Sequence, residues 1–414
     1  MTQPTERLLA GPPLGGRAES LHAHHLRLGA LPHVPAGQMI AALEAAGVLG
    51  RGGAGFPVGR KWRAIFERPD LGTPVIVANG AEGEPESAKD RVLMAHRPHL
   101  VIDGVLIAAR TLGADRVELY LGREHTAAVG AMRAAVEERP KTERKLLHIV
   151  EAPIGYVAGE STAVVHYVNS KDARPMTTPP RMSERGVRNR PTLVQNVESL
   201  AQAALIARFG PDWFREAGRG KNRGTGLITI AGPVRHEGVA EIELGTPLAE
   251  LVEMAGGLTG NPRAVLIGGY FGTWAPMSAA WNVPLDPESL KAAGLTFGCG
   301  LIRLLDERSC GVDYSSRIMD FLAAGSAMQC GPCKYGLADL SAASDRVATM
   351  SPKPTDLDDL ERWCGLVTGR RACRHPDGAA QQMSTALAVF ADDFASHATH
   401  RRCLAAAVPT GARR

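Results

Sequence analysis

A glycine-rich segment from Gly50 to Trp62 has the residue types and spacing of a phosphate-binding loop. It reads Gly-Arg-Gly-Gly-Ala-Gly-Phe-Pro-Val-Gly-Arg-Lys-Trp. Its glycines let the backbone fold tightly around a ligand, and Arg51 and Lys61 could contact the negative charge of a phosphate. It is neither a Walker A sequence nor a Rossmann fingerprint, because no glycine directly precedes the lysine and a predicted helix precedes the loop. A generic glycine-rich turn is the alternative.

A second segment, from Asn79 to Pro85, offers one amide and two carboxylates. It reads Asn-Gly-Ala-Glu-Gly-Glu-Pro and follows a strand predicted at 74–78. Ligands of open α/β sheets bind at the carboxyl ends of strands, where an amide can bond a heterocycle edge and carboxylates can bind sugar hydroxyls. A solvated acidic turn is the alternative. Two further segments, 155–163 and 191–200, are weak signals alone, and the order and separation of all four make them specific.

The seven cysteines all lie in the last third of the chain, at Cys299, Cys310, Cys330, Cys333, Cys364, Cys373 and Cys403. In a reducing compartment such clustering indicates soft-metal or redox chemistry more than a disulfide framework. Four of them are expected to be small buried hydrophobic residues, namely Cys299, Cys310, Cys364 and Cys403.

The composition is that of a globular protein with ample core. The chain has 414 residues, 44% hydrophobic and 22% charged, enough for two to four compact units. Its net charge of +4 is small for this length, which argues against a nucleic-acid binder. No signal-peptide core and no run of 18 apolar residues is present, so we expect a cytoplasmic protein without direct membrane insertion.

Strand and helix patterns divide the chain into three domains with two terminal extensions. Alternating patterns predict an α/β domain with a parallel sheet, from strands at 74–78, 116–121 and 145–151 and helices at 36–49, 100–112, 126–138 and 194–208. Strands at 226–232, 238–244 and 264–267 with a helix at 247–255 suit a β-grasp module. Helices at 314–324, 336–349, 355–367 and 377–395 predict a four-helix bundle. The expected boundaries are a loosely docked or poorly ordered arm 1–35, then 36–222, 223–310, 311–400 and a tail 401–414.

Taken together, the four glycine-containing and polar segments resemble the flavin- and NADH-binding subunit of respiratory complex I. The same family occurs in NAD-reducing hydrogenases and NAD-dependent formate dehydrogenases. The likeness runs from about Met39 to Ala395, in the family's order of a flavin-binding α/β domain, a β-grasp domain and a helical bundle with an iron–sulfur cluster. It implies an FMN-dependent oxidoreductase in which hydride passes from NADH or NADPH to the flavin. Single electrons then pass to an iron–sulfur centre or to a ferredoxin-like or [2Fe–2S] partner.

The resemblance also implies which residues bind the cofactors. FMN would contact Gly50, Arg51, Gly52, Gly53, Ala54, Gly55, Lys61, Asn79, Glu82, Tyr156, Gly159, Glu160 and Asn196. Phe56 stands where the family stacks an aromatic ring on the nucleotide, and Glu84 where it places a nucleotide-contacting carboxylate. Arg181 stands where the family has an aromatic residue, and its guanidinium could suit the extra phosphate of NADPH. Family carboxylates are replaced by Ala81 and Ser161, which leaves open that nicotinamide nucleotides no longer bind.

The cluster motif differs from the family pattern at one ligand. The family run Ser-Cys-Gly-x-Cys-x-Pro-Cys has Ala327 at its first cysteine, so the remaining thiolates are Cys330, Cys333 and Cys373. A [4Fe–4S] cluster ordinarily takes four protein thiolates. The alternatives are a [4Fe–4S] cluster with water, His375 or another group on the fourth iron, a [3Fe–4S] cluster, a zinc site of three cysteines and one histidine, or a relic.

Three functions are compatible with these features. The first is the nucleotide-oxidising flavoprotein described above. The second is an electron-relay or scaffold subunit that holds flavin without nucleotide access, and the third is a binding module that has lost its chemistry. The intact loop at 50–55 with Lys61 argues against the third, since a site without a ligand does not require so many glycines.

Overall fold

A computed structural model of the chain describes residues 6–370 and 373–405. Backbone packing divides the described chain into two units. The first comprises the residues up to 228 together with 239–246, and the second comprises 229–238 and the residues from 247 onward. Each unit is taken by itself below.

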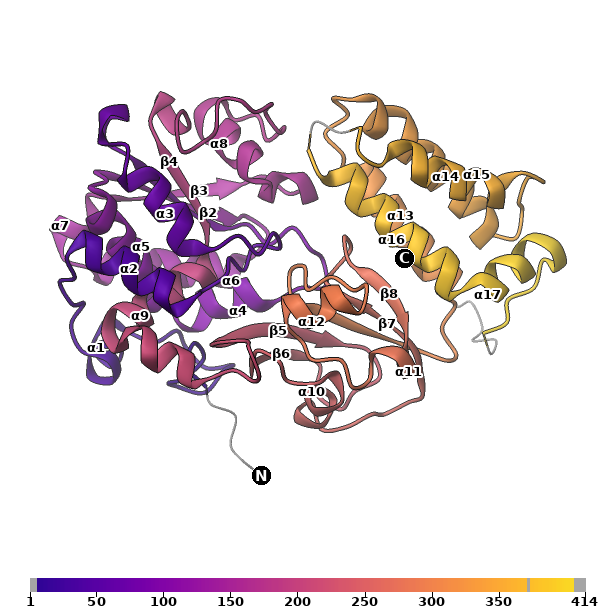
Figure 1. The fold of residues 1–414 in the computed structure, drawn as a ribbon, viewed down its shortest axis with the longest axis horizontal. Coiled ribbons are helices and arrows are strands. Elements are labelled where there is room, and N and C mark those ends of the chain that lie inside the picture. The colour runs from indigo at the N-terminus through magenta and orange to yellow at the C-terminus, as the bar shows by residue number, and fades with distance from the viewer. Residues whose placement is uncertain (1–5, 371–372, 406–414) are drawn as a thin grey trace. The chain divides into compact units, whose positions relative to one another are not determined.

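The first unit is built on a four-stranded parallel sheet (Figure 1). Its strands are β1 (Val75–Gly80), β2 (Arg116–Gly122), β3 (Leu147–Ala152) and β4 (Thr192–Asn196), in the spatial order β3-β2-β1-β4. The chain adds β2 and β3 on one side of β1 and then returns to add β4 on the other. Ligands of open α/β sheets bind where the strand order reverses, so the carboxyl ends of β1 and β4 form the expected crevice.

Helices cover both faces of this sheet. They are α1 (Leu21–Leu28), α2 (Ala36–Ala46), α3 (Val58–Phe66), α4 (Lys89–His96), α5 (Pro98–Leu112), α6 (Thr126–Glu138), α7 (Lys141–Arg144), α8 (Ser161–Ser170) and α9 (Val197–Glu216). Short 3₁₀ turns span Pro69–Leu71, Tyr156–Gly159 and Val187–Asn189. Ile76 and Ala78 of β1 join the large core that includes α5 and α9, whereas Val75 and Val77 join a second core with α8. Burial on both faces explains why β1 is continuously apolar, and it confirms the mixed α/β fold with a parallel sheet.

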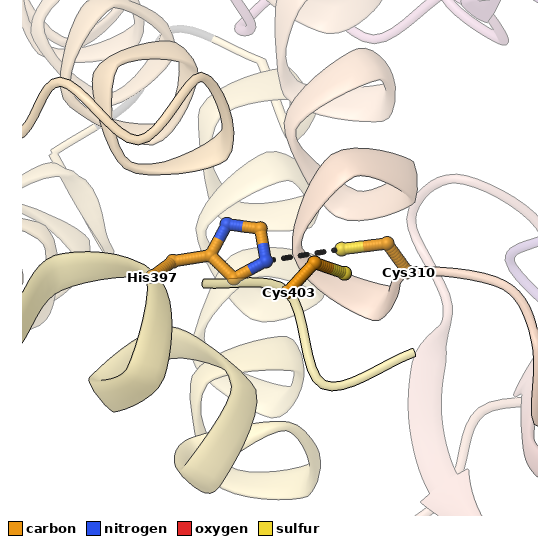
Figure 2. A group of neighbouring side chains, drawn as sticks. All are labelled: Cys310, His397 and Cys403. Carbon is orange, nitrogen blue, oxygen red and sulfur yellow. Dashed lines mark hydrogen bonds between the residues drawn. The ribbon is translucent and has the colours of Figure 1, made fainter. Parts of the chain in front are cut away.

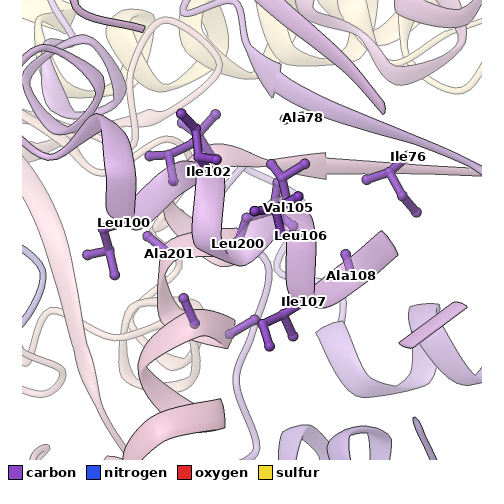
Figure 3. Close-up of a cluster of buried hydrophobic side chains, with 14 of the residues drawn as sticks. Ile76, Ala78, Leu100, Ile102, Val105, Leu106, Ile107, Ala108, Leu200 and Ala201 are labelled. Atoms are coloured by element: carbon purple, nitrogen blue, oxygen red, sulfur yellow. The ribbon is translucent and has the colours of Figure 1, made fainter. Parts of the chain in front are cut away.

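The close approach of α5 to α9 is the tightest point of this core. Figure 3 shows side chains of α5 beside Leu200 and Ala201 of α9. A Cβ added at Gly104 of α5 would lie 2.0 Å from the backbone oxygen of Leu200. Only glycine therefore allows the two helix backbones to approach this closely.

The helix expected at 194–208 begins later than the sequence pattern predicted. Residues Thr192–Asn196 form β4, which pairs in parallel with β1, and α9 starts at Val197. A short apolar run cannot be assigned to strand or helix from its periodicity alone. Here the open edge of β1 provides the backbone partners that make the run a strand, and Asn196 then caps the following helix.

The described part of the N-terminal arm is docked, contrary to the expectation of a loose segment. The carboxylate of Glu241 accepts hydrogen bonds from the backbone N–H groups of Arg7, Leu8 and Leu9 at 2.8–3.0 Å. Leu8 and Leu9 are buried. The many glycines and prolines of the arm suggested a loose segment. The contacts could not be predicted from local sequence, because the Glu241 carboxylate lies more than 200 residues away in the chain.

A second sheet has five strands in the order β6-β5-β9-β7-β8. They are β5 (Thr225–Ala231), β6 (Gly238–Glu243), β7 (Pro262–Ile267), β8 (Thr273–Pro276) and β9 (Leu301–Asp306). Strand β9 pairs in parallel with β5 and antiparallel with β7. Three short helices accompany the sheet, α10 (Leu248–Met254), α11 (Met277–Ala280) and α12 (Pro287–Ala292). Strands β8 and β9 were not predicted from the sequence.

The remaining described residues are helical. The helices are α13 (Gly311–Ala324), α14 (Leu337–Ala348), α15 (Asp356–Val367), α16 (His375–Val389) and α17 (Ala391–Ala395), with π-helical turns at Pro332–Gly336 and Ser396–His400. The pairs α13–α14, α14–α15, α15–α16 and α13–α16 are in contact. The helix expected at 377–395 is broken near Phe390, which separates α16 from α17.

None of the described helices is, on its own, long and apolar enough to cross a membrane. Helices α4 and α5 together have the length and apolar composition of a membrane span, but the chain bends by 96° between them.

We predict that Gly104→Ala destabilises the first unit by at least about 1–3 kcal/mol, because the added methyl group meets a backbone carbonyl rather than a flexible side chain. The matched control is Gly130→Ala in α6, where an added Cβ meets nothing within 4 Å. That change should stabilise by about 0.5–1 kcal/mol. Urea denaturation followed by circular dichroism compares the two, and equal midpoints would contradict the predicted close packing.

Candidate functional site

A cleft in the first unit opens at the carboxyl ends of β1 and β4, where the strand order reverses. Asn79 at the end of β1 is the register partner of Asn196 at the end of β4. The glycine-rich loop closes the cleft beside them. The residues that line it are Gly50, Gly52, Ala54, Gly55, Phe56, Lys61, Asn79, Gly159, Ser161, Val194, Gln195 and Asn196.

The loop is a closed turn between two paired residues. Leu49 and Pro57 form an isolated antiparallel bridge, and the N–H of Gly50 donates to the oxygen of Phe56 at 2.9 Å. A Cβ at Gly50 would lie 3.0 Å from that same oxygen, and Gly55 adopts φ +63°, which favours glycine. The glycines are therefore required by the shape of the turn, and the loop presents mostly backbone to the cleft.

Lys61 is the cation of the cleft. It lies on α3, and its ammonium donates to the backbone oxygen of Val194 in β4. Burial lowers the pKa of Lys61 to about 8. No carboxylate contributes to that shift, so the charged form of Lys61 would be stabilised by an anion placed in the cleft.

Arg51 has a different position from the one its sequence suggested. Its guanidinium donates to the oxygen of Thr225 at 3.0 Å and lies 3.6 Å from the carboxylate of Glu198. Its backbone N–H donates to the hydroxyl of Ser199. The side chain is 4% exposed and does not belong to the described lining of the cleft. Arg51 therefore anchors the loop to the start of α9 and does not reach toward a phosphate in this structure.

A buried ion cluster supports the floor of the cleft. The Lys89 ammonium lies 2.9 Å from the Glu198 carboxylate and 2.7 Å from the Asp90 carboxylate. All three side chains are almost fully buried. Asp90 in turn accepts a hydrogen bond of 2.6 Å from the side-chain amide of Asn196. Burial raises the pKa of Asp90, and the Lys89 ammonium opposes that effect. The cluster fixes the rotamer of Asn196, whose Oδ1 caps α9 at the N–H of Glu198.

Asn79 and Gln195 supply the amides of the cleft. The amide of Asn79 donates to the oxygen of Gly159 at 2.9 Å and its Oδ1 accepts from the N–H of Ala81. Gln195 is 4% exposed, and its Oε1 is buried without a hydrogen-bond partner among the described residues. An acceptor left unpaired in a binding cleft indicates that a ligand donor completes it, because such an atom otherwise costs about 1–3 kcal/mol.

Glu82 and Glu160 cap helices and do not point into the cleft. The carboxylate of Glu82 accepts from the Ser87 hydroxyl and from the N–H groups of Asp90 and Arg91 at the start of α4. The carboxylate of Glu160 accepts from the N–H groups of Thr162 and Ala163 at the start of α8. Neither belongs to the described lining, because each is held by the N-terminal N–H groups of a helix. Their role in this structure is to orient the segments that carry Asn79 and Gly159.

Of the expected nucleotide-side residues, Phe56 lines the cleft, whereas Glu84 and Arg181 do not belong to its described lining. The hydroxyl of Tyr156 donates to Glu84 at 3.4 Å, and a Cβ at Gly83 would touch Tyr156, so the segments 79–85 and 155–163 pack together. Phe56 lies at the rim and is 55% exposed. Arg181 is exposed and does not belong to the described lining.

Three lining residues were absent from the residues expected to bind: Ser161, Val194 and Gln195. Ser161 was noted only as a departure from the family pattern. Val194 and Gln195 were not expected in the cleft because they were predicted to belong to a helix or its approach. As residues of β4 they lie near the carboxyl end of a strand, which is at the sheet edge. The glycine turn, the unpaired Gln195 acceptor and the partly buried Lys61 together fit a ligand with a phosphate and a heterocycle carrying N–H donors.

The three predicted metal-binding cysteines gather in the second unit. Cys333 is buried in the π-helical turn that precedes α14, and Cys330 lies two residues before the start of that turn. Burial raises the pKa of Cys333 to about 12, and the nearby thiols of Cys330 and Cys373 add to the shift. The Cys333 thiol remains protonated unless a metal neutralises its thiolate, and three sulfur atoms placed together form a donor set that fits a soft metal centre.

His375 has a fixed orientation at the start of α16. Its Nε2 donates to the backbone oxygen of Leu322 at 2.7 Å, and burial lowers its pKa. A metal could therefore be bound only through Nδ1 of a neutral imidazole.

The other cysteines do not all match the expectation of buried hydrophobic residues. Cys364 is buried, as predicted, but Cys299, Cys310 and Cys403 are partly exposed. Cys310 and Cys403 lie close to His397.

Comparison with known proteins adds three family models and several relatives. The models are the Nuo51 FMN-binding domain over 43–205, the SLBB domain over 227–269, and the NADH-ubiquinone oxidoreductase-F iron-sulfur binding region over 313–397. The chain is 33% identical over 381 residues to an NADH-quinone oxidoreductase subunit of Rhizobium meliloti, covering 88% of this chain and 90% of that protein. It is 32% identical to the mitochondrial NADH dehydrogenase (ubiquinone) flavoprotein 1 of Dictyostelium discoideum, covering 82% of this chain and 74% of that protein.

Among solved structures, a chain of an NAD+-reducing [NiFe]-hydrogenase in the air-oxidised state matches with a TM-score of 0.82 and 30% identity. The match covers 87% of this chain and 62% of that chain, so this protein spans less than two thirds of the hydrogenase chain. The match to the Rhizobium meliloti protein covers most of both chains, and it therefore assigns this chain to a family. The chain belongs to the complex I 51K family, the flavoprotein subunits of NADH-quinone oxidoreductases.

Proposed function

We propose that this protein is an FMN-dependent oxidoreductase that takes electrons from NADH or NADPH and passes them to an iron–sulfur centre. The observation that carries the proposal is the cleft at the reversal of strand order, where a glycine turn, a partly buried lysine and an unpaired amide oxygen meet. Family membership supplies the identity of the ligand, since the Nuo51 FMN-binding domain matches across most of this unit.

The residues of the cleft have distinct roles in this proposal. Backbone N–H groups of the loop and the Lys61 ammonium hold the phosphate, because both stabilise negative charge without a large side chain. Asn79, Gln195 and Asn196 meet the polar edges of the ring and ribityl chain. When bound, FMN supplies the chemistry that converts a hydride into single electrons. Phe56 at the rim and Glu84 behind Tyr156 are proposed to contact the nicotinamide nucleotide.

The thiolates of Cys330, Cys333 and Cys373 are proposed to hold the iron–sulfur centre, in the region that matches the family's iron-sulfur binding model. With Ala327 in place of a fourth ligand, a [3Fe–4S] cluster or a [4Fe–4S] cluster with a non-cysteine ligand are both compatible. The acceptor is proposed to be a [2Fe–2S] or ferredoxin-like protein. The charge of +4 would favour an acidic partner, and salt should weaken the association.

The finer architecture and the compartment are proposed on the same basis. We assign 36–222 to the flavin domain, 223–310 to a β-grasp domain and 311–400 to the cluster-bearing bundle, with an arm 1–35 and a tail 401–414. The SLBB match at 227–269 supports a separate middle domain. A cytoplasmic location would keep the three cluster thiols reduced.

The proposal predicts that reduced nicotinamide nucleotides bleach the flavin. NADH or NADPH added anaerobically to the FMN-loaded chain should remove the oxidised-flavin absorption band, and Phe56→Ala should weaken the response mainly through KM. Photoreduction with a chemical donor is the control that shows the flavin to be reducible. Bleaching by the control but by neither nucleotide would favour the relay or scaffold function, in which flavin is held without nucleotide access.

The pKa of Lys61 predicts how FMN affinity depends on pH. Above pH 8 the ligand-free lysine loses its proton, whereas the bound phosphate favours the charged form. The affinity for FMN should therefore fall as pH rises above about 8, by up to about tenfold per pH unit. Fluorescence titration with FMN measures this, and riboflavin, which lacks the phosphate, should show no such dependence.

Two variants identify the group responsible for that dependence. Lys61→Met should lower FMN affinity at pH 7 and remove the fall above pH 8, whereas Arg60→Met changes an exposed neighbour on the same helix and should keep it. The same pH profile in wild type and Lys61→Met would show that another group binds the phosphate.

The thiolate set predicts the iron content. Anaerobically prepared protein should retain iron and sulfide, Cys330→Ser should lose most of the iron, and Ala327→Cys should retain more, because it supplies the missing thiolate. Cys299→Ser, at a partly exposed cysteine outside the motif, is the control. Iron analysis with EPR measures the change. A chain without iron, or equal iron in wild type and Cys330→Ser, would refute the assignment.

A further inference from the structure

A second group of soft ligands lies in the helical part of the chain and shares no residue with the cysteine set described above. It consists of Cys310, His397 and Cys403 (Figure 2). Cys310 begins α13, His397 lies in the π-helical turn after α17, and Cys403 follows that turn. The ligand atoms Sγ, imidazole nitrogen and Sγ all lie within 4.8 Å of one another. The fold therefore brings together residues separated by almost ninety positions in the chain.

The orientation of the imidazole is settled by its contacts. Its Nδ1 lies 3.2 Å from the backbone oxygen of Val347, near the end of α14. A carbonyl only accepts hydrogen bonds, so Nδ1 carries the proton and Nε2 of the neutral ring carries the lone pair. Nε2 lies 3.5 Å from Sγ of Cys310. Histidines that bind metals are held in this way, with the second ring nitrogen donating to a carbonyl or carboxylate.

The first sulfur is placed to carry negative charge. Sγ of Cys310 accepts a hydrogen bond of 3.4 Å from the N–H of Asp313, at the N-terminus of the 14-residue helix α13. N–H groups at a helix start stabilise an anion. Cys310 therefore has the N-cap position that favours a thiolate ligand.

The second sulfur is brought in by a turn of the chain. Arg401 adopts a left-handed conformation with φ +49°. The Ser396 hydroxyl donates to the oxygen of Arg402 at 2.8 Å, which fixes the segment just before Cys403. This return of the chain places Cys403 beside the Cys310–His397 pair.

We propose that Cys310, His397 and Cys403 form a zinc site with water at the fourth position. Two thiolates and one imidazole are the ligands of a borderline-soft cation and do not suit Mg²⁺ or Ca²⁺. Tetrahedral bonds of about 2.3 Å to sulfur and about 2.05 Å to nitrogen place those two atoms about 3.6 Å apart, close to the 3.5 Å between Cys310 and His397. Binding releases the two thiol protons, and the metal joins the start of α13 to the segment that follows α17.

The experiment uses the full chain, prepared anaerobically with zinc and analysed for zinc and iron together. We expect about one zinc per chain in addition to the iron. Replacing the metal by Co²⁺ should give sulfur-to-cobalt charge-transfer bands and the intense visible bands of a tetrahedral site. Cys310→Ser should weaken Co²⁺ and Zn²⁺ binding by at least about a hundredfold, because a ligand is lost.

The variants separate loss of metal from loss of fold. Serine is a good N-cap, so Cys310→Ser keeps the start of α13 while removing the thiolate. Cys403→Ser should have the same effect on metal binding, whereas His400→Ala changes an exposed histidine of the same turn and should keep the metal. Circular dichroism confirms that each variant is folded.

A further variant shows that the zinc is not held by the other cysteine set. The triple replacement of Cys330, Cys333 and Cys373 by serine should retain zinc while losing iron. Zinc lost in that triple variant but kept in Cys310→Ser would overturn the proposal. A Cys310–Cys403 disulfide in the anaerobic protein, detected by mass spectrometry, or the absence of cobalt bands at any excess of Co²⁺, would also overturn it.

Discussion

The parallel pairing of β1 with β4 is the constraint on which the candidate site depends. It sets Asn79 opposite Asn196 at one sheet edge and brings Val194 to the ammonium of Lys61. Because β2 and β3 lie on the other side of β1, the pairing also creates the reversal of strand order at which open α/β sheets bind ligands. A slip of the β4 register by one residue would turn Gln195 to the opposite face and remove the cleft's unpaired acceptor.

The cleft is prepared for an anion by what surrounds it. Glu82 and Glu160 accept hydrogen bonds from N–H groups at helix starts, and Glu198 pairs with Lys89, so these three carboxylates have partners within the protein. Lys61 is left with a backbone oxygen as its hydrogen-bond acceptor, and burial weakens its charged form. A phosphate would restore that charge, and Gly50, Gly52 and Gly55 of the turn line the cleft without side chains that would exclude it. The Lys61 ammonium and the shape of the glycine turn therefore both favour a ligand that carries a phosphate.

The sequence was sufficient for the glycine loop, the parallel α/β fold and the gathering of Cys330, Cys333 and Cys373. Predictions from local sequence were wrong where contacts between distant residues determine the structure. Residues 192–196 form β4 because β1 has an open edge, and the arm is docked because the Glu241 carboxylate binds its backbone. Glu82 and Glu160 lie outside the described lining of the cleft, because N–H groups at two helix starts hold both carboxylates. The Cys310–His397–Cys403 group could not be read from spacing, since the turn at Arg401 brings it together.

Hydrogen exchange of the full chain with and without FMN tests the central claim most directly, because it reports where the ligand binds without a substitution. The account predicts slower exchange on FMN addition in the loop at 50–57 and at the carboxyl ends of β1 and β4, around Asn79 and Asn196. Exchange at 65–74, a segment that contributes nothing to the described lining of the cleft, should be unchanged. Protection elsewhere, with none in the loop, would contradict the assignment of the cleft.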